Sequence, residues 1–290
     1  MSALALTDAG NLYGAFEFYK YCKEAEIKAI VGLEATIARK GRGNKDKDND
    51  LYQIVLLARN FEGYLDLIQM VTESYLTGFY FKPRIDFELL EKYGKNLIGL
   101  SGNHTGEISQ HITTGKSEDF IRERIGYYEG IFGKDAFFLE IQEHPDRGAQ
   151  GKINDFCTSL AKKYGYQVVA TNDVFYPSAG DAETQDIFFC IGDGRPLEDP
   201  DRPTLIEGNY SLRPMDEMSE LFAHCPEAIT NTMKIAEMID LKIPYGQTLI
   251  PTFELDPVDH TKYKEYMAKL PEGLKKLDQE EWNLRRVCFE

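Results

Sequence analysis

The stretch Tyr166-Gln-Val-Val-Ala-Thr-Asn-Asp-Val-Phe-Tyr176 sets a pattern that the first half of the chain repeats. Its apolar run, 168–170, is short and lies between a glycine and a proline, which is typical of a fully buried strand. The polar run 171–173 follows directly. Because α/β proteins place their chemistry just past such strands, the stretch predicts an α/β fold with a site at this strand end.

Five further apolar segments precede this one, and helical patterns separate most of them. The predicted strands are 3–6, 27–33, 52–58, 97–100 and 136–141, and the predicted helices are 12–25, 62–74, 87–93, 118–132 and 153–164. This alternation predicts a parallel sheet, since a parallel crossover usually contains a helix. Right-handed crossovers favour closure into a barrel. An open doubly wound sheet is the alternative, but no Gly-rich dinucleotide fingerprint follows any strand.

The pattern changes after Tyr176. Helices are predicted at 181–191, 214–223 and 226–239, an extended stretch at 244–257, and a charged helical segment at 261–290. We therefore divide the chain into a barrel, 1–180, a helical and loop extension, 181–257, and a final segment, 258–290.

Composition limits the function classes. The net charge of −15 disfavours a surface for nucleic-acid phosphates, which needs clustered Lys and Arg. The one basic run, 39–45, is followed by aspartates and is interpreted as a flexible solvated loop. Five cysteines without C-x-x-C spacing indicate reduced thiols in a cytoplasmic protein. Neither a membrane-spanning segment nor a signal peptide is predicted.

An ordered series of motifs covers most of the chain. The motifs are Leu4-Ala-Leu-Thr-Asp-Ala-Gly-Asn-Leu-Tyr-Gly14, Val31-Gly-Leu-Glu34, Gly78-Phe-Tyr-Phe-Lys-Pro-Arg-Ile-Asp86, Leu100-Ser-Gly102, Leu139-Glu-Ile-Gln142 and Ala170-Thr-Asn-Asp-Val174. In this order they resemble the polymerase and histidinol phosphatase (PHP) domain of the bacterial DNA polymerase III alpha subunit. The resemblance implies a distorted TIM-like (β/α)7 barrel. It also implies that a first strand with a His-x-His motif precedes Met1, and that residues 258–290 begin the polymerase palm.

Working members of this family hold divalent metals on His, Asp, Glu and Cys side chains at the strand ends. The positions that keep a family ligand are Glu34, Asp173 and Asp8, and the positions that lack one are Ala9, Gln53, Asn103 and Phe175. Carboxylates alone suit weak Mg²⁺ binding and not the nitrogen-rich cage expected for Zn²⁺ or Mn²⁺. The resemblance therefore implies a degenerate metal site, with no firmly bound cofactor.

Simpler roles remain open for the same residues. Glu34 could cap a helix or pair with Lys28, and Asp173 could hold the loop after its strand through local hydrogen bonds. His104 is interpreted as a loop residue and not as a substitute ligand. His144 is a candidate for the same strand-end cleft.

Three functions are compatible with these residues. The first is a structural PHP module that supports the polymerase body and docks a separate proofreading exonuclease. The second is a metal-dependent phosphoesterase or 3′–5′ exonuclease that acts in proofreading. The third is an unrelated barrel enzyme for phosphorylated metabolites. The ligand positions favour the first. The resemblance implies that the parent chain is a Mg²⁺-dependent DNA-directed DNA polymerase, and we expect these 290 residues alone to be inactive and to bind little DNA.

Overall fold

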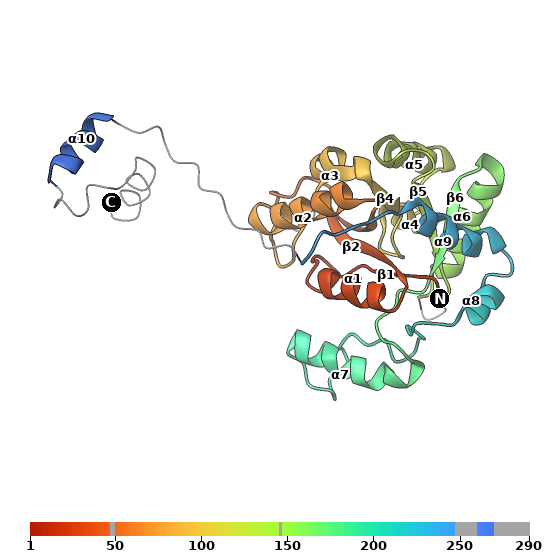
Figure 1. Ribbon diagram of the computed structural model, residues 1–290. Helices are drawn as coiled ribbons and strands as arrows, with labels where there is room; N and C mark the ends of the chain where they lie inside the picture. The colour runs from red at the N-terminus through yellow and green to blue at the C-terminus, as the bar shows by residue number, and fades with distance from the viewer. Residues whose placement is uncertain (47–49, 145–146, 247–259, 270–290) are drawn as a thin grey trace. The chain divides into compact units, whose positions relative to one another are not determined.

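The computed structural model describes residues 1–46, 50–144, 147–246 and 260–269 (Figure 1). The chain forms two compact units, Met1–Ile243 and Pro244–Glu290. The first unit contains the sheet and helices α1 to α9. In the second unit, α10 (His260–Lys269) coincides with the start of the predicted helical segment, and the rest of that segment lies outside the described residues.

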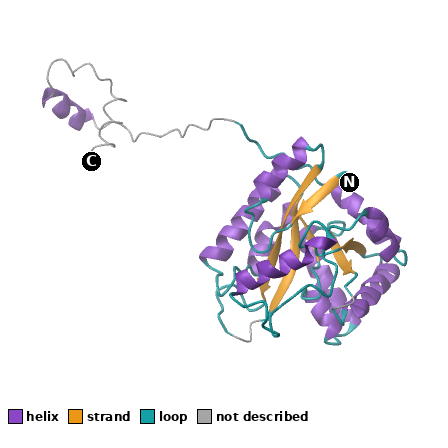
Figure 2. Ribbon diagram, turned by 90° about the horizontal axis from the view of Figure 1, so that it is seen from below, coloured by secondary structure: helices purple, strands orange, loops and turns teal. Residues whose placement is uncertain are grey.

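The first unit is built on one six-stranded sheet in the order β1-β2-β3-β4-β5-β6. Figures 1 and 2 show the sheet curling, with helices around it, as an incomplete α/β barrel. All six predicted strands are confirmed, and the second is longer than expected. Their bounds are β1 (Ala3–Leu6), β2 (Lys28–Ala38), β3 (Leu51–Ala58), β4 (Leu97–Leu100), β5 (Phe137–Gln142) and β6 (Gln167–Thr171).

The prediction of a wholly parallel sheet is wrong at β3. This strand runs antiparallel to both β2 and β4, whereas the β1–β2, β4–β5 and β5–β6 pairs are parallel. The reason is the connection after β2, where the described residues contain no helix and the chain returns directly as an antiparallel neighbour. The reversal places the beginning of β3 beside the carboxyl ends of its two neighbours, β2 and β4, at the edge where β1, β5 and β6 also end.

The predicted helices are present within a few residues of their expected bounds. They are α1 (Ala15–Glu24), α2 (Phe61–Leu76), α3 (Phe87–Tyr93), α5 (Glu118–Phe132), α6 (Gln150–Tyr164), α7 (Ala182–Asp193), α8 (Met215–Leu221) and α9 (Pro226–Met238). One helix was not predicted, α4 (Glu107–Thr113). Its inward face is partly polar, with Glu107 and His111 both buried, so hydrophobic periodicity does not reveal it.

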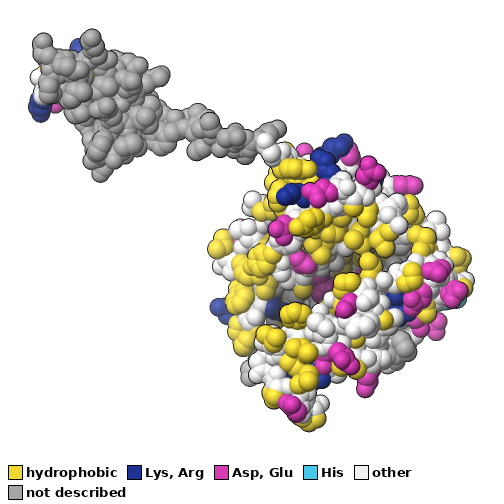
Figure 3. Space-filling model, turned by 60° about the horizontal axis from the view of Figure 1, so that its bottom comes forward, with side chains coloured by type: hydrophobic (Ala, Val, Ile, Leu, Met, Phe, Trp, Pro, Cys, Tyr) yellow, Lys and Arg dark blue, Asp and Glu magenta, His cyan; other side chains and the backbone are white. Residues whose placement is uncertain are grey.

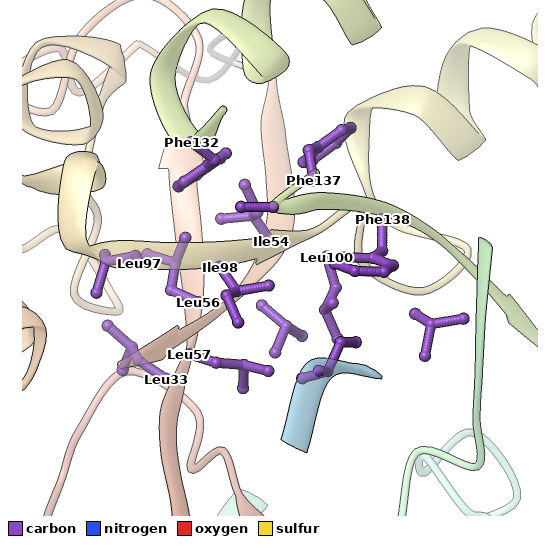
Figure 4. Packing of buried hydrophobic residues seen from close by; sticks show 14 of the residues in the cluster. Leu33, Ile54, Leu56, Leu57, Leu97, Ile98, Leu100, Phe132, Phe137 and Phe138 are labelled. Carbon is purple, nitrogen blue, oxygen red and sulfur yellow. The ribbon is translucent and has the colours of Figure 1, made fainter. Parts of the chain in front are cut away.

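The core lies between the sheet and the surrounding helices (Figure 4). Leu56 and Ile98, from neighbouring strands, are fully buried. Phe132 of α5 and Phe137 of β5 stack with ring centroids 6.0 Å apart and planes 7° from parallel. The Phe132 ring requires a glycine on β4, because a Cβ atom at Gly99 would lie 2.5 Å from it. This close contact fixes α5 against the centre of the sheet.

The basic loop after β2 is fastened to the body of the first unit. The buried Arg84 guanidinium donates hydrogen bonds to the carbonyl oxygens of Gly78, Asn44 and Arg42 at 2.9, 2.9 and 2.7 Å. Arg42 in turn forms an ion pair with Asp86 at 2.9 Å. The expectation of a freely solvated loop is therefore corrected for residues 39–46, whose charges are used to hold the loop in place.

The two edge strands, β1 and β6, leave the sheet open on one side. A cavity of about 620 Å³ lies there, with Leu4, Ala5, Val169 and Ala170 among its lining residues. Helix α9 packs on β6, where the Asn231 amide donates to the Val168 carbonyl oxygen at 2.7 Å. At the other end of α9, the Lys28 ammonium of β2 donates to the carbonyl oxygens of Ala236 and Ile239. The helix thus ties the two sides of the open sheet together.

Candidate functional site

Two carboxylates on strands and one that follows a strand form one cluster, called here the carboxylate cluster: Glu34, Glu140 and Asp173. Glu34 is on β2, Glu140 is on β5, and Asp173 follows β6. The negative charge of Asp173 raises the pKa of both glutamates, and Glu140 also raises the pKa of Glu34. The cluster therefore behaves as one electrostatic unit, at the strand ends where the sequence predicts the site. Figure 3 shows acidic side chains inside a hollow with hydrophobic side chains around it.

The backbone and an amide side chain both position Glu34. Its N–H donates to the Asp8 carbonyl oxygen at 3.1 Å, and its own carbonyl oxygen accepts from Gly10 N–H at 2.9 Å. The Gln53 amide of β3 donates to Glu34 Oε1 at 2.7 Å. Burial is the main cause that raises the Glu34 pKa to about 7, and the two neighbouring carboxylates raise it further.

Glu140 is the member of the cluster that sequence reasoning missed. Its side chain is only 5% exposed. The Thr171 hydroxyl donates to Glu140 Oε1, and the Gln142 amide donates to the same oxygen at 3.0 Å. Burial raises the Glu140 pKa to about 7, although these hydrogen bonds act to lower it. The signal that could have identified it is an acidic residue inside the otherwise apolar run Leu139-Glu-Ile141.

Asp173 carries an ion pair that the sequence did not predict. Arg147 Nη1 lies 2.8 Å from Asp173 Oδ2, and both side chains are 13% exposed. The backbone of Asp173 has φ of 48°, a left-handed conformation that turns the chain sharply after β6. The ion-pair partner of Asp173 thus lies 26 residues earlier in the sequence, and a role of Asp173 in local hydrogen bonds stays a prediction.

An aromatic ring from the helical extension covers this ion pair. Tyr210 is fully buried and lies 4.9 Å below the Arg147 guanidinium. The His144 ring also stacks on Tyr210, with the two ring centroids 4.2 Å apart, and His144 Nε2 lies 3.0 Å from the Asn172 carbonyl oxygen. His144 is thus a buried neighbour of the site, in the cleft region where it was expected, and it makes structural contacts.

The four positions that lack a family ligand lie in distinct environments. Ala9 forms a parallel bridge with Glu34 and faces solvent. Gln53 accepts a hydrogen bond from the Thr105 hydroxyl in addition to donating to Glu34. Asn103 Oδ1 accepts a hydrogen bond from the backbone N–H of Thr105 at 2.9 Å. Phe175 is 42% exposed and packs 5.8 Å from Phe189, so its ring does not seal the cluster.

The last two residues predicted for the site are Asp8 and His104. Asp8 is partly buried at the end of β1, where a Cβ atom on Gly14 would lie 3.3 Å from Asp8 Oδ2. His104 is partly buried in the loop after β4. The alternative that Lys28 pairs with Glu34 is wrong, because the Lys28 ammonium binds carbonyl oxygens at the end of α9.

Comparison with known proteins agrees with the motif series. Residues 1–144 match the PHP domain. These residues belong to the PHP domain family. The whole chain is similar to DNA polymerase III subunit alpha of Borreliella burgdorferi, with 39% identity over 281 residues. The aligned region covers 95% of this chain and 24% of that protein. The corresponding subunits of Treponema pallidum and Thermus aquaticus are 34% and 37% identical over 92% and 87% of this chain.

The chain spans about a quarter of the length of these curated relatives, 24%, 23% and 21% respectively. The resemblance inferred from the motifs is therefore confirmed, and the relatives extend beyond the PHP domain. Within the described ranges, no helix combines the length and apolar character needed to cross a bilayer.

The carboxylate cluster does not fit the metals expected of a PHP domain. Among the described residues, no three His, Cys, Asp or Glu side chains are arranged to hold one ion. The Gln53 amide points an N–H group at Glu34, whereas a ligand would have to direct a lone pair at a metal. The Arg147 guanidinium adds positive charge beside Asp173, which disfavours a cation at that carboxylate.

Proposed function

We propose that the chain is the N-terminal PHP module of a replicative DNA polymerase III alpha subunit, and that this module is structural, with a degenerate metal site. Its place in DNA replication rests on the relatives, which are named as alpha subunits of that polymerase. The structural role rests on the carboxylate cluster. Protein groups contact each of its members: the Gln53 amide contacts Glu34, Thr171 and Gln142 contact Glu140, and Arg147 contacts Asp173.

The observation that carries this proposal is the contact between Gln53 and Glu34. The Thr105 hydroxyl donates to Gln53 Oε1, so the amide orientation places Nε2 2.7 Å from Glu34 Oε1. The resemblance places a metal-binding histidine at position 53. A glutamine in this orientation satisfies the carboxylate directly, and the metal has no remaining role in holding β2 and β3 together at this point.

Several wider features belong to the same proposal. The complete domain would be a distorted (β/α)7 barrel formed by residues 1–180 together with a strand that precedes them. Residues 181–257 would form a helical extension, and 258–290 would begin the palm of the polymerase. The partners would be the rest of the alpha chain and a proofreading exonuclease subunit, in the cytoplasm. The polymerase itself would use Mg²⁺, and this module would contact little DNA because of its net charge of −15.

Metal content and hydrolysis test the proposal directly. The purified chain is analysed for Zn, Mn, Fe and Mg, and then assayed with nitrophenyl phosphate and with single-stranded DNA, with and without Mn²⁺. We expect less than stoichiometric metal and no hydrolysis above that of a mock preparation. Hydrolysis that Asp173→Ala abolishes, while Asp216→Ala on the exposed first turn of α8 leaves it intact, would instead establish the metal-dependent exonuclease.

A further inference from the structure

The carboxylate cluster brings together three acidic groups, and the guanidinium of Arg147 lies beside them in an ion pair with Asp173. We propose that Arg147 is the built-in counter-ion of the carboxylate cluster, a guanidinium that has taken over the electrostatic role of the metal. This inference goes beyond the structural function proposed above, because it assigns the stabilisation of the cluster to one residue outside the ligand positions of the family.

The guanidinium of Arg147 connects two strand ends. Arg147 lies between β5 and α6, and Asp173 lies just after β6. Their 2.8 Å ion pair therefore joins the carboxyl ends of two adjacent strands. A metal ion bound by residues from several strand ends would join the same elements. Since both side chains are only 13% exposed, water screens the pair weakly.

The charge of Arg147 reaches past its direct partner. Arg147 Nη1 also lies 3.5 Å from Gln142 Oε1, and the Gln142 amide donates to Glu140 Oε1 at 3.0 Å. Arg147 thus contacts Asp173 directly and Glu140 through one side chain, and its charge also acts on Glu34. Lys82, whose charge acts on Glu34 as well, is exposed, so solvent and salt weaken its influence.

Separate contacts fix the backbone and the guanidinium of Arg147. The backbone N–H of Arg147 donates to the His144 carbonyl oxygen at 3.0 Å, and the Arg147 carbonyl oxygen accepts from the backbone N–H of Gln150 at 2.7 Å. The Tyr210 ring, which is fully buried, lies 4.9 Å from the guanidinium carbon. A planar cation on an aromatic face is a favourable arrangement in a desolvated site.

These properties separate a guanidinium from the metal that it replaces. An arginine stays protonated at all physiological pH values and cannot leave the protein. It has no open coordination position, so it cannot bind and activate water as a divalent metal does. The replacement would therefore keep the strand ends together and remove the hydrolytic chemistry.

Thermal unfolding of the 290-residue chain in EDTA at pH 8 tests this assignment. We expect Arg147→Gln to lower the Tm by roughly 5–10 °C, because it leaves the cluster without its buried cation. Asp173→Asn added to Arg147→Gln should recover at least half of that loss. Glu34→Gln should also raise the Tm of the Arg147→Gln variant more than that of the wild type, although Glu34 makes no ion pair with Arg147.

Two further variants keep the outcome decisive. Arg147→Lys retains the charge, so its Tm should fall clearly less than that of Arg147→Gln. The Arg147→Lys variant also provides a measurement if Arg147→Gln does not fold. Arg195→Gln removes an arginine from a more exposed i,i+4 pair with Asp199 and should change the Tm by less than about 2 °C.

Purely additive effects of Arg147→Gln with Asp173→Asn and with Glu34→Gln would overturn the counter-ion assignment. Equal losses for Arg147→Lys and Arg147→Gln would also overturn it, because the role would then depend on shape. These readouts are independent of the proposed function, which fails only if the wild type contains stoichiometric metal or hydrolyses phosphate esters.

Discussion

Two buried glutamates in this protein have the same exposure and opposite surroundings. Glu107 and Glu140 are each 5% exposed. The Arg124 guanidinium binds both oxygens of Glu107, at 2.8 and 3.0 Å, and the Tyr128 hydroxyl donates to it at 2.6 Å. Glu140 receives hydrogen bonds from neutral groups, and within the described residues its Oε2 atom has no hydrogen-bond partner.

The difference lies in whether a cation contacts the buried carboxylate. A bidentate arginine compensates the loss of water around Glu107 and links α4 to α5. Glu140 lacks a direct cation, and burial raises its pKa to about 7. A buried carboxylate with an unsatisfied oxygen calls for an explanation, and the degenerate metal site proposed above would supply one.

Removing the charge of Glu107 should change the free energy of unfolding more than any other substitution that tests this comparison. Glu107→Gln leaves the half-buried Arg124 guanidinium without its ion partner, so we expect the free energy of unfolding to fall by about 3 kcal/mol. Urea denaturation monitored by circular dichroism measures it. Glu118→Gln, in a more exposed pair with Lys163, is the matched control and should have a much smaller effect. Equal losses in both variants would show that burial does not distinguish the two pairs.

The second-largest expected effect is a change of stability with pH, caused by the titration of Glu140. Its folded pKa of about 7 lies above the ordinary value of 4.5, so the folded state holds this proton more tightly than the unfolded state. Its contribution to stability is therefore greatest below about pH 4.5 and is lost as the pH rises to about 7, a change of roughly 2–3 kcal/mol.

The difference in unfolding free energy between the wild type and Glu140→Gln isolates this contribution. That difference should become less favourable to the wild type from about pH 5 to pH 7 and stay constant above pH 7.5. A difference that does not change with pH would mean that Glu140 titrates normally. Urea titrations at half-unit intervals of pH provide the measurement.

Thr171→Val should have a smaller effect, of about 1–2 kcal/mol at pH 8, because it removes a hydroxyl that donates to the ionised Glu140. The loss should shrink at pH 5, where the carboxyl is protonated. Thr113→Val, whose exposed hydroxyl donates to the Gln110 carbonyl oxygen, is a control that should show no such pH dependence. The same loss at both pH values would assign the effect of Thr171 to packing.

Restoring imidazoles should have the smallest effect. Ala9→His places a ring next to Glu34 on the bridge between β1 and β2, so weak Mn²⁺ binding should appear. Phe175→His should add less, because residue 175 packs toward Phe189. Calorimetric titration with Mn²⁺ compares the variants with the wild type. Tight stoichiometric binding by Phe175→His alone would contradict the orientation of that side chain.

The sequence by itself determined the order of strands and helices and the family. An apolar run bounded by polar or turn residues is a local signal, because such a run tends to be buried whatever surrounds it in the chain. Strand β6 and its neighbours could therefore be predicted from single segments. The same local rule located Glu34 and Asp173, because both stand at or near the ends of such runs. Residues at fixed positions in the motif series then indicated which ligands are missing.

Only the tertiary structure decided the direction of β3 and the partners of the cluster. The apolar pattern that predicts a strand is the same for parallel and antiparallel pairing. The direction of β3 depends on how the connection after β2 returns the chain to the sheet. Arg147 and Tyr210 carry no local signal, since an arginine in a loop and a tyrosine in an extension have many possible roles. They meet Asp173 because folding brings separate segments together, and a buried charge is stabilised by whichever groups surround it in space.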